Sequence, residues 1–599
     1  MFKTILAHVG KYKKFAVLAP LMIVVEVLIE VSIPYMMSVI VDCGIGGAPL
    51  TSKTGLVVQL LLRLGFGSKS GTELIVSTGL VMIVLACLSL AAGALAAYFA
   101  ARGGMGFGAN LRAALFARIQ NFSFRNIDDF STGSLITRIT TDTNMIQMGF
   151  TMALRMLVRS PLMFVMAIVM AFSINARLAS VFLFVAPVMF LLILIIGMSA
   201  HKRFAAMFKK YDAFNTMIQE NLIGIRVVKA FVRAEHEKEK FKVANDDLKN
   251  ASIFAEKLII LNNPIMSVSV YTCILLVLYF GSRLITGGQM ELGDLMSSIT
   301  YIQQIFMSLM MISMIFVMSV MALASMKRVC AVLTSEPEIR DDEADENLLV
   351  ENGSVEFRGV CFKYNKDGEK NVLENVNLTI DSGDVVGIIG ATGSAKSSLV
   401  QLIPRLYDVT EGEVLVSGRN VKEYKLKELR KSVGMVLQNN LLFSGTIAEN
   451  LRWGDENATD EELRHAAQIA QADGFITSFP DGYETDLGQG GVNVSGGQKQ
   501  RLCIARAILK KPKILILDDS TSAVDTATDA KIREEMRKLL PGTTKIIIAQ
   551  RISSIQHADK IVVLDDGKIN DVGTHDELLE RNEIYREVYT SQQSGRMEA

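Results

Sequence analysis

Six long apolar runs constrain the fold of this chain more than any other feature of its sequence. A helix needs about twenty mostly apolar residues to cross a bilayer, and runs of this length lie at 15–41, 74–100, 148–172, 178–200, 258–281 and 295–321. Half of the 599 residues are hydrophobic, and the mean hydropathy is +0.32. The sequence therefore predicts an α-helical domain with six transmembrane spans in the first half of the chain.

The orientation of these spans follows from their number and from the charges beside them. An even number of spans places both ends of the chain on one side. Four basic residues crowd the start of the first span, namely Lys3, Lys11, Lys13 and Lys14. Because basic residues favour the cytoplasmic side, we expect a multi-pass protein of the inner or plasma membrane with both termini in the cytoplasm. The first residues contain no small-residue cleavage site, so we expect no cleavable signal peptide.

Two polar stretches, 101–147 and 201–257, then face the cytosol. Both are long, charged and helix-periodic, which excludes them from lipid. The simpler interpretation is that they only connect spans. The alternative is that their tips, around 125–135 and 211–222, dock on a second domain and transmit its motion.

The composition changes after the last span. We expect a six-span domain over 1–334, a solvated acidic linker over 335–353 and a second domain over 354–599. In the second domain apolar strands alternate with helical patterns, as in an α/β fold. Three strands are continuously apolar, which is typical of buried parallel strands: VVGIIG (385–390), KILILDD (513–519) and KIIIAQ (545–550).

A glycine loop follows the first of these strands. GATGSAKS (390–397) stands between strand and helix and fits a Walker A phosphate loop, so the fold class is that of a P-loop nucleotide-binding domain. Backbone N–H groups wrap the phosphates, Lys396 adds a positive charge, and Ser397 offers a hydroxyl to Mg²⁺. The predicted nucleotide-binding residues of this loop are Gly390, Ala391, Thr392, Gly393, Ser394, Ala395, Lys396, Ser397 and Ser398.

One loop residue departs from the pattern. Ala395 stands where glycine is usual before the lysine. Its methyl group crowds the phosphate or disfavours a left-handed backbone, so we expect nucleotide to bind, but more weakly.

A second phosphate-site element supports the first. The strand in KILILDD (513–519) ends at Asp518, a carboxylate that holds Mg²⁺ through water beside phosphates. Together the two elements place a magnesium nucleotide at the carboxyl ends of parallel strands. The expected cofactors are therefore ATP and Mg²⁺.

The remaining motifs resemble those of ATP-binding cassette (ABC) proteins. VSGGQKQR (494–501) resembles the signature motif of this family, and its residues Ser495, Gly496, Gly497 and Gln498 open a helix that forms a second anion site. The resemblance also implies that Tyr364 stacks on adenine and that Gln438 senses the nucleotide and Mg²⁺. SAVD (522–525) and TDLGQGG (485–491) match the D-loop and X-loop. The resemblance covers essentially the whole chain and implies an exporter half-transporter.

Two further departures fall on the hydrolysis step. The family places a glutamate after the Walker B aspartate and a histidine in the switch loop; here these positions are Asp519 and Gln550. The shorter carboxylate ends about 1.5 Å short, and placement errors of about 1 Å can cost ~100-fold in rate. Glutamine can bond a γ-phosphate but cannot carry a positive charge. We interpret this nucleotide site as degenerate, with neutral drift in an active enzyme as the alternative.

Two phosphate-binding helix starts in one domain imply that two such domains meet face to face. The resemblance then predicts a heterodimer, whose second half-transporter carries the working glutamate and histidine. The intact signature motif of this chain would complete the active site of that partner. A homodimer would have two poor sites.

The predicted function is ATP-driven export of amphipathic small molecules, such as drugs, lipids or peptides. Glu26 and Glu30 lie in the first span, where they either pair internally or line a cavity that prefers cations; Arg155 and Arg159 are expected near the cytosolic boundary of the third span. An importer remains possible, and a nucleotide-gated channel is less favoured because the spans contain few polar residues. The six spans exclude a soluble ATPase, and the zero net charge gives no reason to expect nucleic-acid binding.

Overall fold

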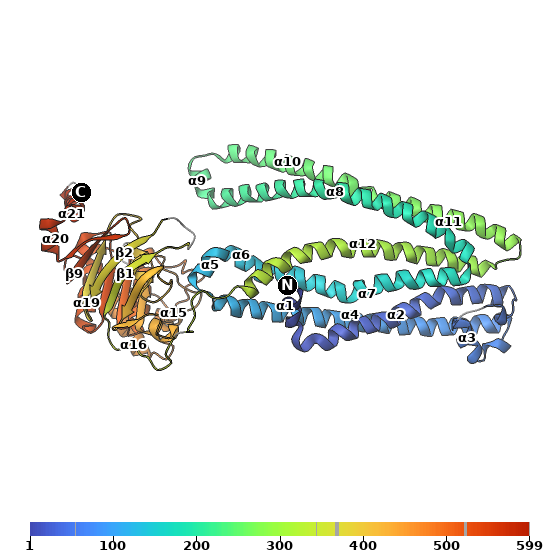
Figure 1. Ribbon diagram of the computed structural model, residues 1–599, viewed down its shortest axis with the longest axis horizontal. Coiled ribbons are helices and arrows are strands. Elements are labelled where there is room, and N and C mark those ends of the chain that lie inside the picture. The colour runs from blue at the N-terminus through green and yellow to red at the C-terminus, as the bar shows by residue number, and fades with distance from the viewer. Residues whose placement is uncertain (54–55, 343, 366–369, 520–523, 598–599) are drawn as a thin grey trace. The chain divides into compact units, whose positions relative to one another are not determined.

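The computed structural model describes residues 1–53, 56–342, 344–365, 370–519 and 524–597 (Figure 1). The chain divides into two compact units. The first comprises Met1–Arg118 and Gly133–Thr334, and the second comprises Ile119–Thr132 and Ser335–Ala599.

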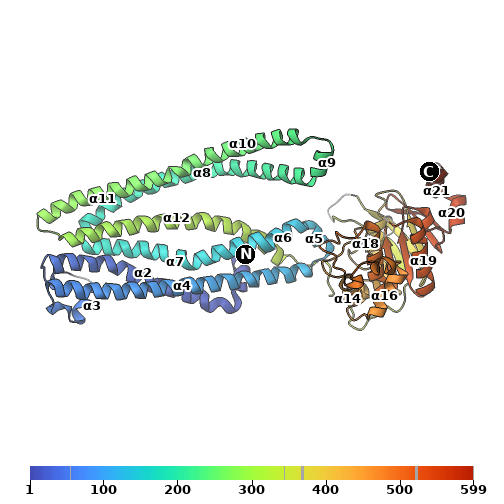
Figure 2. The ribbon, with the colours of Figure 1, turned by 180° about the vertical axis from the view of Figure 1, so that it is seen from behind.

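The first unit is helical throughout its described elements. Its helices are α1 (Phe2–Leu6), α2 (Lys13–Val39), α3 (Leu56–Arg63), α4 (Gly71–Gln120), α6 (Thr132–Thr137), α7 (Thr143–Ile174), α8 (Ala176–Ile223), α9 (Ile225–Ala230), α10 (Ala234–Ile260), α11 (Asn262–Thr286) and α12 (Leu292–Thr334). Figures 1 and 2 show the long helices of this unit running side by side.

Each of the six predicted spans falls on helix. Five helical stretches in the described part of the chain are long and apolar enough to cross a membrane: Phe2–Ile45, Gly71–Gln120, Thr132–Ile174, Ala234–Thr286 and Leu292–Ile312. The fourth predicted span lies in α8, where the described apolar helix is the shorter Ala176–Met189. The helical transmembrane domain is thus confirmed, and the full length of its fourth span stays a prediction.

The predicted cytosolic stretch 201–257 forms a helical arm. α8 and α10 pack against each other, and the short α9 joins their ends (Figure 1). Large apolar side chains at this end are exposed, including Ile223, Phe231 and Val232. An apolar tip at the end of a polar arm is typical of a surface that contacts another protein.

The two glutamates of the first span are paired with an arginine. Arg159, on α7, donates to Glu26 Oε1 and, at 2.7 Å, to Glu30 Oε2, both on α2. Arg159 is thus held against the first span by an ion triad, and its expected position near the cytosolic boundary stays a prediction. Internal pairing, one of the two alternatives for the glutamates, is what the structure shows.

A second ion cluster joins the loop after α2 to the start of α12. Lys53 Nζ lies 2.6 Å from Asp42 Oδ2 and 2.6 Å from Asp294 Oδ1. The side chains of Lys53 and Asp42 are only 6% and 2% exposed. Asp42 Oδ1 also accepts the backbone N–H of Gly293 at 2.6 Å. This cluster ties the ends of the two helices together.

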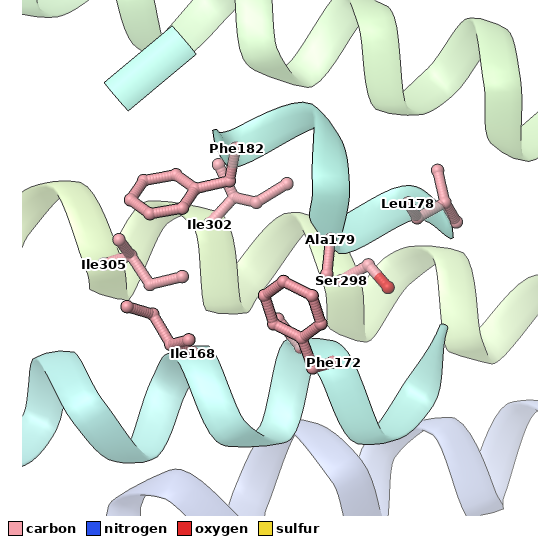
Figure 3. Close-up of a pocket in the computed structure, with 9 residues that line it drawn as sticks. Ile168, Phe172, Leu178, Ala179, Phe182, Ser298, Ile302 and Ile305 are labelled. Atoms are coloured by element: carbon pink, nitrogen blue, oxygen red, sulfur yellow. The ribbon is translucent and has the colours of Figure 1, made fainter. Parts of the chain in front are cut away.

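A small cavity lies among α7, α8 and α12 (Figure 3). Ile168, Phe172, Phe182 and Ile305 line it with apolar groups, and Ser298 contributes a hydroxyl (Figure 3). Its volume of about 10 Å³ corresponds to about one water molecule. This cavity is therefore a gap in the packing and is too small for a drug-sized ligand.

The second unit is an α/β domain with two sheets, as predicted. One sheet has the order β2-β1-β4-β5 and the other β10-β9-β3-β8-β7-β6. The strands are β1 (Val355–Phe362), β2 (Leu373–Ile380), β3 (Val385–Ile389), β4 (Glu411–Val416), β5 (Arg419–Asn420), β6 (Val433–Val436), β7 (Ile514–Asp518), β8 (Thr544–Ile548), β9 (Lys560–Asp565) and β10 (Lys568–Gly573). Every residue of β7 and β8 is buried, which confirms that the continuously apolar runs are internal strands.

Helices pack around these sheets (Figure 2). They are α13 (Lys396–Gln401), α14 (Leu426–Ser432), α15 (Ile447–Arg452), α16 (Asp460–Ile469), α17 (Asp473–Ile476), α18 (Gly496–Leu509), α19 (Thr526–Leu539), α20 (His575–Arg581) and α21 (Glu583–Met597). The second unit also contains α5 (Phe124–Phe130), which comes from the first predicted cytosolic stretch.

Helix α5 is docked on the second unit by polar and aromatic contacts. Tyr407 donates its hydroxyl to Asp128 Oδ2 at 2.7 Å, and its ring lies 6.1 Å from that of Phe124. Asn126 Nδ2 donates to Glu336 O at 3.2 Å. The tip of the first cytosolic stretch is therefore more than a connector between spans.

The acidic segment 335–353 is also attached to this unit. No helix or strand occurs among its described residues. Ile339 and Val350 are buried, and Glu338 forms an ion pair with Arg125 of α5 at 3.1 Å. The segment packs more closely than the solvated linker that its composition suggests.

Replacing Lys53 with methionine tests the ion cluster. The change leaves Asp42 and Asp294 without their shared cation, and breaking a buried pair in this way costs about 3–5 kcal/mol. We expect a clearly lower midpoint of thermal unfolding for the full chain in detergent. Lys69→Met is the control, since Lys69 faces the exposed Glu73 at 3.7 Å and such surface pairs contribute at most about 1 kcal/mol. Equal midpoints for the two variants would contradict the structural role of the cluster.

Candidate functional site

Four neighbouring parallel strands, in the order β3-β8-β7-β6, carry the predicted nucleotide residues. The glycine loop follows β3, Gln550 follows β8, Asp518 ends β7, and Gln438 follows β6. The carboxyl ends of parallel strands meet at one edge of a sheet, which is where α/β proteins bind ligands. The sheet thus brings four separate motifs to one edge.

The glycine loop is tightly packed at its start. A Cβ added at Gly390 would lie 2.1 Å from Leu564 O, so only glycine fits there. The ammonium of Lys396 donates to the backbone oxygens of Gly390 and Ala391 at 2.9 and 2.8 Å, and to Ser394 Oγ at 3.3 Å. Lys396 therefore lies across the glycine loop, with which it is predicted to bind phosphate. Thr392 is exposed within this loop.

Ala395 occupies a left-handed backbone conformation, with φ 70° and ψ 24°. This conformation costs an L-residue with a Cβ roughly 1–2 kcal/mol. Gly393, with φ 86°, has no such cost. The left-handed backbone anticipated for Ala395 is therefore present, and crowding of a phosphate by its methyl group stays a prediction.

Ser397 and Asp518 are brought together as a magnesium site requires. Ser397 Oγ donates to Asp518 Oδ1 at 2.9 Å. A hydroxyl and a carboxylate are the oxygen ligands that Mg²⁺ accepts beside phosphates, so these residues fit the ion. Gln438 is exposed at the same sheet edge, and its contribution to the ion stays a prediction.

Burial shifts the titration of the charged groups at this edge. It raises the pKa of Asp518, with the Asp519 carboxylate adding to the shift and Ser397 and Lys396 opposing it. It also lowers the pKa of Lys396, although both carboxylates oppose the change. Burial thus disfavours the charged form of each group, and a bound ion of opposite charge would favour that charged form again.

Asp519 and Gln550, the two departures at the hydrolysis step, contact each other. Gln550 Nε2 donates to Asp519 Oδ2 at 2.7 Å. Burial raises the pKa of Asp519, and this hydrogen bond opposes the rise. The backbone of Asp519 is left-handed, with φ 47°. The sequence placed both residues on one reaction step but gave no indication that they bond to each other.

Tyr364 lies beside the glycine-loop helix. Its hydroxyl forms a 2.8 Å hydrogen bond with Ser398 Oγ. Its ring stands edge-on to Phe362 and Tyr407, with centroids 4.9 and 5.2 Å away. The side chain is exposed, as a residue that stacks on a ligand must be, and its role toward adenine stays a prediction.

The signature motif forms the start of α18. Ser495 and Gln498 make a reciprocal capping box: Gln498 N donates to Ser495 Oγ at 3.3 Å, and Ser495 N donates to Gln498 Oε1 at 2.8 Å. Ser495 and Gly496 are exposed, and Gly497 is partly buried. This helix start therefore presents backbone N–H groups at the surface, as an anion site requires. Ser522 and Ala523 of the predicted D-loop lie outside the described residues.

Two residues with contacts near the site carried no signal in the sequence. Tyr407 links the ring of Tyr364 to Asp128 of α5. Gln592, on α21, bonds the backbone of the loop that carries Gln550. A solitary tyrosine and a glutamine in a polar helix show no pattern, and only the tertiary contacts reveal them.

Comparison with known proteins identifies the family. The family models described as "ABC transporter transmembrane region" and "ABC transporter" match residues 17–309 and 373–522. The chain is 39% identical over 514 residues to the "Uncharacterized ABC transporter ATP-binding protein YfiB" of Bacillus subtilis, covering 86% of this chain and 89% of that protein. This chain belongs to the ABC transporter family. An ATP-binding domain of this kind implies ATP-hydrolysing transport.

Two further relatives of this ABC transporter refine the comparison. The "Putative multidrug export ATP-binding/permease protein YgaD" of Bacillus subtilis is 33% identical over 487 residues, 81% of this chain and 83% of its own. A solved structure, that of a bacterial Atm1-family ABC exporter with ATP bound, superposes with a TM-score of 0.78 at 26% identity. It covers 97% of this chain and 99% of that one. The transporter thus has the exporter fold, with the membrane domain fused ahead of the ATP-binding domain.

Ala395→Gly separates folding from nucleotide binding in this transporter. The strain at Ala395 lies in its own backbone, with φ 70°, so glycine should relieve it in the folded chain whether or not nucleotide is bound. We expect the free energy of unfolding to rise by about 1 kcal/mol and the ATP affinity to change by less than about threefold. Ala391→Gly is the matched control, because Ala391 lies in the same loop without a positive φ. A large gain in affinity from Ala395→Gly would show that the methyl group crowds the phosphate instead.

Proposed function

We propose that this chain is one half of a heterodimeric, ATP-driven exporter of amphipathic small molecules. Its own nucleotide site binds MgATP and hydrolyses it poorly. Its signature motif completes the site of a partner that supplies the missing glutamate and histidine. Turnover then occurs mainly at the shared site, and ATP binding at the degenerate site holds the two cassettes together.

The contact between Asp519 and Gln550 carries this proposal. A general base takes a proton from the attacking water, and here one oxygen of the shortened side chain, Asp519 Oδ2, accepts a hydrogen bond from Gln550 at 2.7 Å. The amide that holds it is neutral and cannot take up a proton. This hydrogen bond holds one carboxylate oxygen on a neutral amide and opposes proton uptake by Asp519, which favours binding over turnover.

The surface of the signature helix supports the need for a partner. Ser495 and Gly496 are exposed at the start of α18, where the Ser495 hydroxyl accepts from Gln498 N and the Ser495 N–H donates to Gln498 Oε1 in a capping box. A helix start of this kind binds an anion, and the γ-phosphate held by a second cassette is the anion that the family arrangement provides. Dimers are also common among ABC exporters.

The exposed apolar tip of the α8–α10 arm supports assembly as well. Ile223, Phe231 and Val232 are exposed there. In the second unit Phe443 and Trp453 stack at 4.2 Å and are also exposed. Two groups of exposed apolar side chains in one chain are consistent with contacts between two half-transporters.

The ion triad of the first unit bears on the cargo. Glu26 and Glu30 share one guanidinium, that of Arg159, so carboxylates outnumber cations at this point. Groups of this kind within spans face a polar cavity or each other. The excess of carboxylate favours amphipathic cargo that is positively charged, in keeping with a multidrug-type exporter.

Restoring the two family residues tests the degenerate site. We expect Asp519→Glu combined with Gln550→His to raise ATP turnover at this site by up to ~100-fold, since placement errors of about 1 Å cost that much. The measurement is steady-state ATPase activity of the complex with the co-purified partner, beside the isolated chain. The isolated wild-type chain should be nearly inactive.

Gln556→His, on the same loop, serves as the control for an added histidine and should leave turnover unchanged. Asp518→Asn should abolish any restored activity, because it removes the magnesium carboxylate. Turnover by the isolated wild-type chain at a rate typical of a pump would sink the degenerate-site proposal and favour an active homodimer in which Asp519 suffices.

Tyr407→Phe tests whether α5 carries the motion of the cassette. The change removes only the hydroxyl that donates to Asp128 at 2.7 Å, and hydrogen bonds to charged groups contribute about 1.5–3 kcal/mol. We expect transport of a cationic amphipathic dye to fall several-fold per ATP hydrolysed, with ATP affinity unchanged. Tyr483→Phe is the control, because Tyr483 makes the same kind of bond to Asp473 at 2.8 Å. An equal effect of both variants would indicate a general loss of stability.

A further inference from the structure

We propose that Gln592, on the last helix α21, is a positioning residue for the loop that carries Gln550. This loop, residues 549–557, runs from the end of β8 past η7 (Ile552–Ser554). The proposal rests on the proposed function and on the interpretation that Gln550, at the switch-loop position, bonds the γ-phosphate. It adds a part of the chain that none of the nucleotide motifs includes.

Both ends of the Gln592 amide bond the backbone of this loop. Ile552 N donates to Gln592 Oε1 at 2.9 Å. Gln592 Nε2 donates to Gln550 O at 2.8 Å. One side chain thus satisfies a donor and an acceptor two residues apart, as a neighbouring strand would, although it comes from a helix 42 residues away along the chain.

These bonds act where the loop leaves the sheet. Ala549 N is still held by Ile388 O of β3 at 3.2 Å. Beyond Gln550 the described loop has left the strand ladder, and Gln592 fixes the carbonyl of Gln550 itself. The Gln550 side chain then donates to Asp519 Oδ2 at 2.7 Å. These contacts therefore connect α21 to Asp519 through the backbone carbonyl and the side chain of Gln550.

A different helix holds the far side of the same loop. Arg533, on α19, donates to Ser553 O at 3.0 Å and to Ser554 O at 2.9 Å. It also pairs with Asp529 at 2.9 Å. These bonds begin three residues after Gln550, so Arg533 restrains the loop and not Gln550 itself. The direct restraint on Gln550 is the one from Gln592.

Helix α21 is rigid enough to serve as a support. Tyr585, in its first half, is only 1% exposed. Its hydroxyl shares a 2.8 Å hydrogen bond with His575 Nδ1, at the start of α20. Val588 and Tyr589 pack against the same buried core. A side chain projecting from a helix fixed in this way holds its partner more precisely than one from a free loop.

The test compares ATP with ADP, since only ATP offers a γ-phosphate to Gln550. The full chain in detergent or nanodiscs is titrated with MgATP and with MgADP, and the ratio of the two affinities is measured. We expect Gln592→Ala to lower the preference for ATP by about three- to tenfold, as the loss of two backbone hydrogen bonds implies. The MgADP affinity and the midpoint of thermal unfolding should stay close to wild type.

Two variants separate positioning from packing. Gln592→Glu keeps the size and the acceptor for Ile552 N, but it faces Gln550 O with a second acceptor, so it should lower the ratio at least as much as alanine. Gln593→Ala is the matched control and should leave the ratio unchanged, because Gln593 is the next residue on α21 and donates to the Tyr589 hydroxyl at 3.1 Å. If Gln592→Glu behaves as wild type, the hydrogen bonds do not matter and the proposal is overturned.

A double variant completes the test. In a Gln550→Ala chain, Gln592→Ala should cause no further loss, because both act through one group. Additive losses, or equal weakening of ATP and ADP, would overturn the positioning role. If Gln550→Ala lowers the ratio and Gln592→Ala does not, the present proposal alone fails. If Gln550→Ala itself leaves the ratio unchanged, Gln550 does not meet the γ-phosphate, and the positioning proposal fails with that premise, whereas the degenerate-site proposal stands or falls by the turnover measurements.

Discussion

The parallel pairing of β3, β8, β7 and β6 is the constraint on which the nucleotide site depends. Its register sets Asp518 opposite Ile548, so the next residues on the two strands, Asp519 and Ala549, leave the sheet together and Gln550 follows. A slip of one residue would turn every side chain of a strand to the opposite face. Burial of all residues in β7 and β8 makes such a slip costly, since each apolar group would need a new partner.

Charge placement in the membrane unit follows a second rule, that buried charges are paired. Lys53 is held between Asp42 and Asp294, and Arg159 between Glu26 and Glu30. Both clusters join helices that are far apart in sequence. They fix α2 against α7 at one level and against the start of α12 at another. The charges of this unit therefore define how its helices pack, in addition to any role toward cargo.

Much of this architecture could be predicted because it depends on local patterns. Unbroken apolar runs predicted β3, β7 and β8, and the glycine spacing predicted the phosphate loop at 390–397. Contacts between distant side chains left no such pattern. The charge rule that places basic residues near a membrane boundary concerns loops, and it gave no indication that Arg159 bonds two carboxylates on another helix. The bonds of Gln592 and Tyr407 could not be predicted for the same reason, and the packing of Ile339 and Val350 is not visible in an acidic composition.

The two departures at the hydrolysis step are physically linked. Asp519 has a left-handed backbone, a conformation in which the short side chains of Asp and Asn are several-fold enriched among non-glycine residues. Its carboxylate ends where Gln550 Nε2 reaches it at 2.7 Å. A glutamate at the same backbone position would end about one carbon–carbon bond, ~1.5 Å, farther out, and a histidine in place of Gln550 would present a ring instead of an amide. Each residue therefore suits the other, and changing one alone would break their bond without restoring the family pair. Such coupling between neighbours supports the proposal that the two substitutions belong to one altered site.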